Sequence, residues 1–169
     1  MKLLTAPMGT AAFNISGLTI HSALCLNDLQ GGKLLAENLN TLRNALGKLT
    51  VLIIDEVSMV GAPMMAQVDR RLRQIKSTDK LFGGVCVLAV GDLYQLPPVQ
   101  QKPVFAVPTT GLLALYGSPW LDNVRMIELT HNMRQRDALF SEILGRVRIG
   151  VLTKEDEQVL LRRLITVPR

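Results

Sequence analysis

The chain has 169 residues, of which 48% are hydrophobic and 20% are charged, a composition typical of a folded domain and not of a disordered chain. Its formal net charge of +5 permits a polyanionic partner but does not require one. No apolar run approaches the roughly 18 residues of a membrane helix, and Cys25 and Cys86 are too few for a disulfide framework. We therefore expect an intracellular protein with no membrane partner.

The first part of the chain predicts short strands and helices in alternation. Lys2–Ala6 is predicted to be a strand, and the stretch that follows it starts a helix. Thr19 is placed to cap a short helix through His21 and Ser22. Leucines at helical spacing then predict an amphipathic helix that Gly47 ends. These leucines are Leu35, Leu39, Leu42 and Leu46.

Two apolar runs in the middle of the chain, Val51–Ile54 and Val85–Val90, predict strands that are buried on both faces. Such strands are typical of a parallel sheet covered by helices on both sides. Cys86, inside the second run, is expected to be a buried small hydrophobe. Between the two runs, Pro63 suits the first turn of a helix. The apolar side of this helix carries Met64, Val68, Leu72 and Ile75. Off that side lie Arg70, Arg71 and Arg73.

The last part of the chain predicts a long connection followed by helices. Gln100–Pro119, rich in Pro, Gly and Thr, is predicted to be a surface connection, and Arg125–Thr130 a weaker strand. Helices are predicted over Ala138–Arg148 and Lys154–Leu164. The second begins with the spacing of a capping box, Thr153 and Asp156. Helices that alternate with buried strands predict an α/β fold in layers.

Both strong strands run directly into acidic residues. Asp55 and Glu56 follow the first strand, and Asp92 follows the second after one glycine. Because ligands of parallel sheets bind at the carboxyl ends of the strands, we expect these acids on one rim. An Asp beside a Glu suits nucleotide hydrolysis, with the Asp holding Mg²⁺ and the Glu activating water. A solvated surface turn is the alternative.

Two further side chains are candidates for contact with a phosphate group. Gln95 follows the second strand as an uncharged donor and acceptor, and two prolines after it restrict the chain. Arg134 precedes a predicted helix, and its planar fork suits the charge that develops on a phosphoryl group. A proline-rich loop and a surface arginine are the plainer interpretations.

Four segments of the sequence, in order, resemble motifs of the Pif-one family of DNA helicases, relatives of RecD within helicase superfamily one. They are APMGTAAFNISGLTIHS, LIIDEVSMV, FGGVCVLAVGDLYQLPPV and LTHNMRQRDALFSEILGRVRIG. The stretch LNTLRNALGKLTVLIIDEVSMVG is most similar to the Pif-type helicase domain of Helitron transposons. The resemblance spans almost the whole chain, and the pair IIDEVSM and GDLYQLPPV makes it specific.

This resemblance implies a RecA-like P-loop NTPase fold of the α/β class with a mainly parallel sheet. Residues 1–135 would be a partial first RecA-like motor domain, and residues 136–169 a helical segment leading to a second one. The implied activity uses ATP and Mg²⁺ to move 5′ to 3′ along single-stranded DNA, including duplex junctions. The implied setting is DNA repair, recombination, telomere or genome maintenance, or transposon replication, in the nucleus, with the mitochondrion as the alternative.

The resemblance also implies roles for single residues. Asp55 would bind Mg²⁺ and Glu56 would be the general base. Gln95 would sense the ATP state and link it to DNA, and Arg134 would contact the γ-phosphate. Residues implied to lie in segments that touch the DNA backbone are Pro7, Gly9, Thr19, His21 and Ser22.

The sequence departs from the family in one important respect, because it contains no G-x-x-x-x-G-K-[ST] motif, the P-loop. We expect a truncated fold without the P-loop strand, with exposed strand edges, marginal stability and no ATP hydrolysis unless the rest of the helicase is supplied. Two alternatives remain open. One is a non-catalytic DNA-binding or interaction module. The other is an unrelated Mg²⁺-dependent α/β hydrolase that uses Asp55, Glu56 and Asp92.

Overall fold

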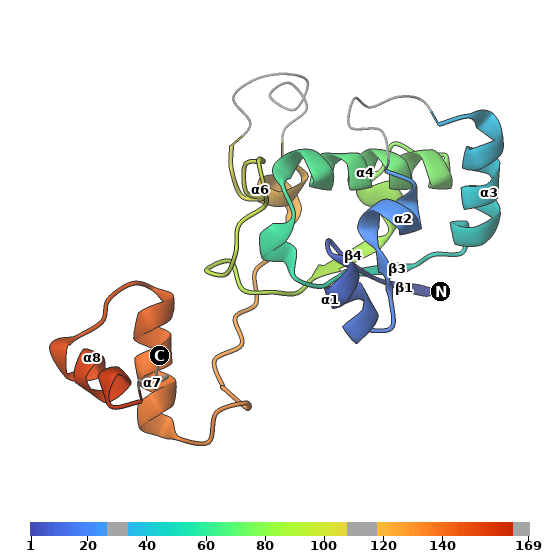
Figure 1. Cartoon of the computed structure of the whole chain (residues 1–169). Coiled ribbons are helices and arrows are strands. Elements are labelled where there is room, and N and C mark those ends of the chain that lie inside the picture. Colours follow the sequence, from blue (N-terminus) through green and yellow to red (C-terminus); the bar gives the residue numbers. More distant parts are fainter. Residues whose placement is uncertain (27–33, 108–117, 164–169) are drawn as a thin grey trace. The chain divides into compact units, whose positions relative to one another are not determined.

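The computed structural model describes residues 1–26, 34–107 and 118–163. The chain forms two compact units, residues 1–125 and residues 126–169, and each is described by itself (Figure 1). No helix within the described residues is long and apolar enough to span a membrane.

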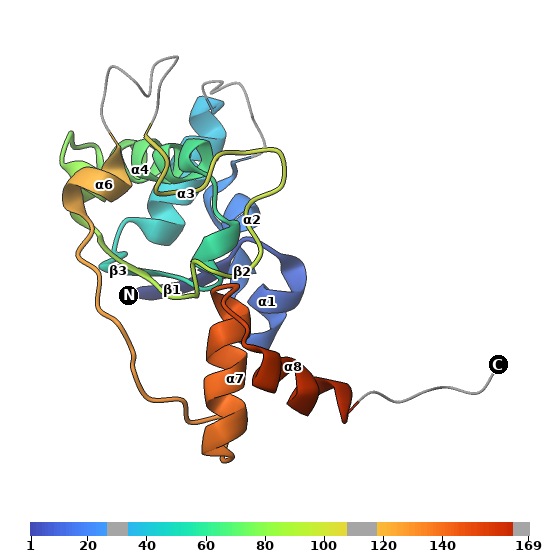
Figure 2. The same ribbon diagram turned by 90° about the vertical axis from the view of Figure 1, so that its left-hand side faces the viewer.

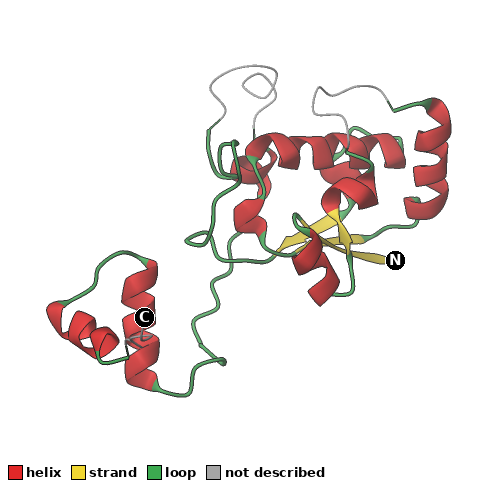
Figure 3. Ribbon diagram, viewed as in Figure 1, coloured by secondary structure: helices red, strands yellow, loops and turns green. Residues whose placement is uncertain are grey.

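The first unit is built on a sheet of four strands, all parallel, in the order β2-β1-β3-β4 (Figure 3). The strands are β1 (Lys2–Ala6), β2 (Leu18–Thr19), β3 (Val51–Ile54) and β4 (Cys86–Ala89). In register, Ile54 of β3 lies between Thr5 of β1 and Ala89 of β4. The carboxyl ends of the three longer strands are therefore level, and the predicted parallel α/β sheet is confirmed.

The helices of this unit are α1 (Gly9–Asn14), α2 (Ile20–Leu24), α3 (Ala36–Leu46), α4 (Ala62–Lys76) and α6 (Pro119–Asn123), with 3₁₀ turns η1 (Val57–Met59) and η2 (Leu81–Gly84). Helices α2, α3 and α4 gather on one side of the sheet, as the two views of Figures 1 and 2 show. Helix α4 packs against α3, α6 and η2. The largest fully buried side chains between these layers include Ile20, Leu24, Leu49, Leu52, Ile54, Met65, Val68 and Leu72.

Helix α4 follows its predicted pattern. Pro63 lies in its first turn, and the predicted apolar side is buried in the core. Arg71, predicted to lie off that side, is also buried, with 7% of its surface exposed. The protein covers this helix beyond its apolar side, since α3, α6 and η2 all pack on α4.

The prediction that β4 is buried on both faces is wrong. The strand is shorter than predicted and lies at the end of the sheet order, so β3 is its only strand neighbour among the described residues. Cys86 is exposed, not buried, and 51% of the Leu88 surface is open to solvent. Leu88 lies in register with Ile53, which is in register with Leu4, itself 40% exposed. This row shows that one face of the sheet carries an open apolar surface in the part of the chain that the structure describes.

Two predictions for the chain after β4 also need correction. Arg125–Thr130, predicted to be a strand, is exposed non-regular chain, because no described strand lies beside it to accept its hydrogen bonds. The predicted surface connection Gln100–Pro119 is partly anchored, since Val104 is only 1% exposed and Pro103 forms an antiparallel bridge with Gly61. Its residues 108–117 lie outside the described residues.

The second unit holds helices α7 (Ala138–Arg148) and α8 (Lys154–Leu161). The predicted capping box of Thr153 and Asp156 is present, with both of its hydrogen bonds. Arg146 of α7 donates to both carboxylate oxygens of Asp156, at 2.6 and 2.7 Å. The Arg146 hydrogen bond lowers the pKa of Asp156 to about 2, so this ion pair ties the two helices together. The predicted end of α8 at Leu164 lies outside the described residues.

Candidate functional site

The acidic pair lies where β3 ends, beside the chain that leaves β4. The Val90 amide donates to the Ile54 carbonyl at 2.8 Å, and the Val57 amide donates back to the Val90 carbonyl at 3.0 Å. The Asp55 amide donates to the Thr5 carbonyl of β1 at 2.8 Å. The turn that carries Asp55 and Glu56 is therefore fixed by hydrogen bonds to both neighbouring strands.

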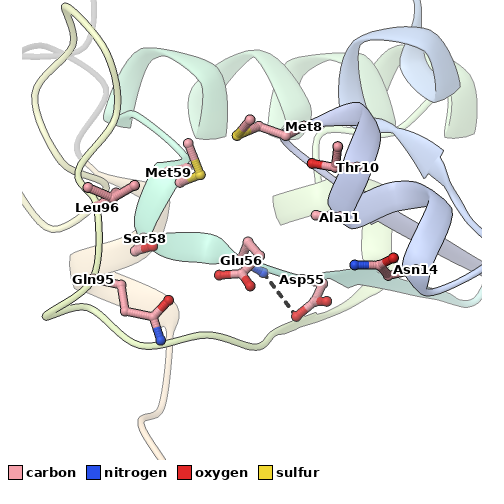
Figure 4. A pocket seen from close by; sticks show the side chains of 10 residues that line it. All are labelled: Met8, Thr10, Ala11, Asn14, Asp55, Glu56, Ser58, Met59, Gln95 and Leu96. Atoms are coloured by element: carbon pink, nitrogen blue, oxygen red, sulfur yellow. Dashed lines mark hydrogen bonds between the residues drawn. The ribbon is translucent and has the colours of Figure 1, made fainter. Parts of the chain in front are cut away.

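The backbone of this turn takes a conformation that residues other than glycine rarely adopt. Glu56 has φ of 52°, in the left-handed region, and its amide donates to the Asp55 carboxylate at 3.0 Å (Figure 4). Such a conformation costs of order 1 kcal/mol or more and is often found at functional sites. Gly91 packs against the same turn, since a Cβ at this position would lie 2.8 Å from the Val57 amide nitrogen. Only a glycine lets the turn after β3 and the segment after β4 approach this closely.

Gln95 is held in a tight turn directly after β4. Asp92 accepts hydrogen bonds from the Tyr94 amide at 3.0 Å through its side chain and from the Gln95 amide at 2.9 Å through its carbonyl. The Gln95 side-chain amide reaches the Asp92 carboxylate only at 3.5 Å, a long and weak contact. The chain after Gln95 is anchored at α4, where the Ala62 amide donates to the Lys102 carbonyl at 3.0 Å. The Gln95 backbone is thus positioned while its side chain stays exposed.

These elements enclose a cleft of about 270 Å³ at the carboxyl edge of the sheet. Its lining residues are Met8, Thr10, Ala11, Asn14, Asp55, Glu56, Ser58, Met59, Gln95 and Leu96. Figure 4 shows the α1 residues on one side, Ser58, Met59, Gln95 and Leu96 on the other, and Glu56 between them. Of the three acids expected on one rim, Asp55 and Glu56 line the cleft together with Gln95, whereas Asp92 is not among the lining residues.

Three polar residues of the lining, Thr10, Asn14 and Ser58, were not predicted from the sequence. Thr10 and Asn14 lie four positions apart on α1, a spacing that places both on the same side of a helix. Ser58 follows the acidic pair within the same short motif. Helical spacing and proximity to the acids are signals in the sequence, but neither indicates that α1 faces the acids across the cleft.

The donor set of the cleft fits a magnesium ion held partly by the protein. Mg²⁺ is usually bound by one or two carboxylates, with waters and substrate phosphates completing its shell, and Asp55 can supply one such carboxylate. Among the described residues, no group of three or more His, Cys, Asp or Glu is placed to hold a metal. Asp55, Glu56 and Asp92 therefore do not form the three-carboxylate cluster expected of an unrelated hydrolase.

The other predicted residues are not among those that line this cleft. Arg134 belongs to the second unit, where its amide donates to the Asn132 side chain at 3.0 Å. The residues predicted to face DNA lie at the carboxyl ends of β1 and β2 and in the helices that follow, as Pro7, Gly9, Thr19, His21 and Ser22. Thr19 caps α2 as predicted, since its hydroxyl accepts from the Ser22 amide at 3.2 Å.

The comparisons with known proteins identify the chain. Residues 1–158 match the sequence profile of the PIF1-like helicases. The chain belongs to the PIF1-like helicase family. Its resemblance to that family, proposed from four motifs, is thereby confirmed. An ATP-dependent DNA helicase PIF1 of Saccharomyces cerevisiae is 34% identical over 160 residues, which are 91% of this chain and 18% of the yeast protein. An ATP-dependent DNA helicase Pif1 of Campylobacter jejuni is 31% identical and matches 94% of this chain, which corresponds to 36% of that protein.

Solved structures support the same family fold. The Pif1 helicase from Bacteroides, crystallised with ADP-AlF3 and ssDNA, superposes with a TM-score of 0.71 at 30% identity, over 94% of this chain and 39% of that one. The Pif1 helicase from Candida albicans gives a TM-score of 0.72 at 28% identity, over 99% of this chain and 38% of that one. This PIF1-like chain therefore spans less than half the length of these relatives.

Proposed function

We propose that this PIF1-like chain supplies part of the first RecA-like motor domain of an ATP-dependent DNA helicase that moves 5′ to 3′ along single-stranded DNA. The observation that carries the proposal is the cleft in which Asp55, Glu56 and Gln95 meet at the carboxyl edge of a parallel sheet. A Bacteroides relative crystallised with ADP-AlF3 and ssDNA supports both ligands, a nucleotide and a single strand.

The two carboxylates take different roles because the turn separates them. Asp55 holds Mg²⁺, which supplies charge neutralisation for the outer phosphates when it is bound. Asp55 Oδ1 also accepts a hydrogen bond from the Glu56 amide, and this bond fixes the orientation of the Asp55 carboxylate. Glu56, in a left-handed conformation, orients the attacking water and accepts its proton. Gln95, on a turn anchored to α4, contacts the terminal phosphate or its water and passes the nucleotide state to the DNA-facing elements.

The remaining predicted residues complete the proposed enzyme. Arg134 contacts the γ-phosphate, while the segments that carry Pro7, Gly9, Thr19, His21 and Ser22 contact the DNA backbone. We propose single strands and duplex junctions as substrates, in DNA repair, recombination, genome maintenance or transposon replication. The proposed location is the nucleus or the mitochondrion.

The absence of a P-loop motif from the 169 residues limits what this polypeptide does alone. A P-loop supplies a lysine and a cradle of backbone amides for the β- and γ-phosphates. Without them, we expect weak nucleotide binding and no measurable turnover from the isolated chain. Its functional partner is then the remainder of a helicase, which contributes that cradle and the second RecA-like domain.

A segment exchange tests the proposal. Residues 1–158 of this chain replace the matching segment of the Bacteroides Pif1 helicase, and ATP hydrolysis is measured with and without single-stranded DNA. We expect DNA-stimulated hydrolysis, and we expect Glu56→Gln in the exchanged segment to keep nucleotide binding and abolish turnover. A folded exchange that binds DNA but hydrolyses no ATP would instead support a non-catalytic module.

A further inference from the structure

Ser58 has a property that the proposed roles do not use. Its residue is only 5% exposed, and its hydroxyl oxygen is buried without a hydrogen-bond partner among the described residues. The side chain nevertheless lines the cleft, on the same side as Gln95 and beside Glu56 (Figure 4). A buried polar group without a partner is rare in native proteins and costs stability, so its presence at a cleft points to an absent ligand.

The backbone gives Ser58 little freedom to find another partner. It is the central residue of η1, which is closed by hydrogen bonds from the Met59 amide to the Glu56 carbonyl at 3.1 Å and from the Val60 amide to the Val57 carbonyl at 3.0 Å. The start of the turn is bound to the chain after β4 through the Val57 amide. The backbone of Ser58 is therefore held beside the cleft by the same hydrogen bonds that position the acids.

The charge of the cleft explains why a hydroxyl is useful there. Asp55 and Glu56 are both acceptors when ionised, and they repel the oxygens of a phosphate. A neutral donor beside them offsets part of that repulsion without adding a charge. Thr10, Asn14 and Gln95 also carry donors, but all three are exposed and must be ordered when a ligand binds. Ser58 is already ordered and desolvated.

We propose that Ser58 is a ligand-binding residue of this cleft, and that its hydroxyl donates a hydrogen bond to an oxygen of the magnesium-bound phosphate ligand. The inference rests on the proposed function, because it takes the ligand to be a nucleotide. It predicts that Ser58→Ala has opposite effects on the stability of the empty chain and on ligand binding. The empty chain gains or keeps stability, since a buried unsatisfied group is removed, while the ligand loses a contact.

The test uses the whole 169-residue chain and a matched serine. Ser118 is also buried, at 7% exposure, but its hydroxyl accepts from the Leu121 amide at 3.3 Å as the cap of α6. Unfolding midpoints are measured without ligand, and millimolar Mg²⁺·ATPγS is titrated while the amide NMR signals of Asp55 and Glu56 are followed. We expect Ser58→Ala to keep or raise the midpoint and to weaken ATPγS binding about fivefold or more. Ser118→Ala should lower the midpoint and leave binding unchanged.

Each contrary result has a clear meaning. If Ser58→Ala lowers the midpoint as much as Ser118→Ala does, the hydroxyl has a structural partner and the inference is wrong. If Ser58→Ala binds ATPγS as tightly as the unaltered chain, the inference fails while the proposed function stands. If the unaltered chain shows no response to Mg²⁺·ATPγS, the inference fails for this polypeptide, and the segment exchange decides the proposed function separately.

Discussion

Gly91 offers a direct test of how the acidic turn is built. Its φ of 153° lies where a side chain is rarely accommodated, and a Cβ there would lie 2.8 Å from the Val57 amide nitrogen and 3.2 Å from Val57 Cγ1. The Val57 amide is the group that donates to the Val90 carbonyl at 3.0 Å. Gly91→Ala must therefore strain the backbone and push apart the two segments that carry Glu56 and Gln95.

The magnitude follows from these two effects. An unfavourable backbone conformation costs of order 1–3 kcal/mol, and the loss of one hydrogen bond costs about 0.5–1.5 kcal/mol. We expect Gly91→Ala to lower the free energy of unfolding of the first unit by roughly 2–4 kcal/mol. Gly9→Ala is the matched control, since nothing lies within 4 Å of a Cβ at that position and its φ is not positive. Its effect should be within about 0.5 kcal/mol.

Urea denaturation followed by tryptophan fluorescence measures this difference. Trp120 is the single tryptophan of the chain and packs against the core of the first unit, so its emission reports unfolding of that unit. Equal unfolding free energies for Gly91→Ala and Gly9→Ala would refute the close approach of the segment after β4 to the acidic turn. A loss for Gly91→Ala alone would support it.

Three further predictions test the sheet surface, the second unit and the proposed role of Arg134. Leu88→Lys should change the free energy of unfolding by less than about 1 kcal/mol and reduce light scattering, while Leu52→Lys should unfold the first unit, since Leu88 is 51% and Leu52 0% exposed. Similar losses of unfolding free energy for both variants would show that the sheet face carrying Leu88 is not open to solvent. The Asp156 carboxylate, whose pKa Arg146 lowers to about 2, stabilises the second unit above its ordinary pKa of 3.8 and loses that contribution as the pH falls through 2. Helix content by circular dichroism should show this acid loss, and Asp156→Asn should remove it; an unchanged acid profile in that variant would contradict the role of the ion pair. In the exchanged segment, Arg134→Ala should lower turnover by roughly a thousandfold, and near-normal turnover would exclude contact with the γ-phosphate.

Local patterns in the sequence determined the elements whose stability depends on neighbours along the chain. The apolar side of α4 and its proline near the start were predicted because helical spacing alone defines them. The capping box of Thr153 and Asp156 was predicted because both hydrogen bonds form within one turn. The position of Asp55 and Glu56 at a strand end followed from an apolar run meeting two charges. The motifs around these acids were enough to indicate the PIF1-like family.

Only the tertiary structure decided features that depend on distant segments. Cys86 and Leu88 are exposed because they lie on the open face of the sheet, which also exposes Leu4 of β1, and an apolar run does not encode which face is covered. Arg71 is buried although it lies off the apolar side of α4, on which α3, α6 and η2 all pack. The Ser58 hydroxyl is buried without a hydrogen-bond partner among the described residues, which the sequence motif around it does not indicate. Sequence patterns describe which surfaces a segment can bury, whereas the partners that cover those surfaces are set by the packing of the whole unit.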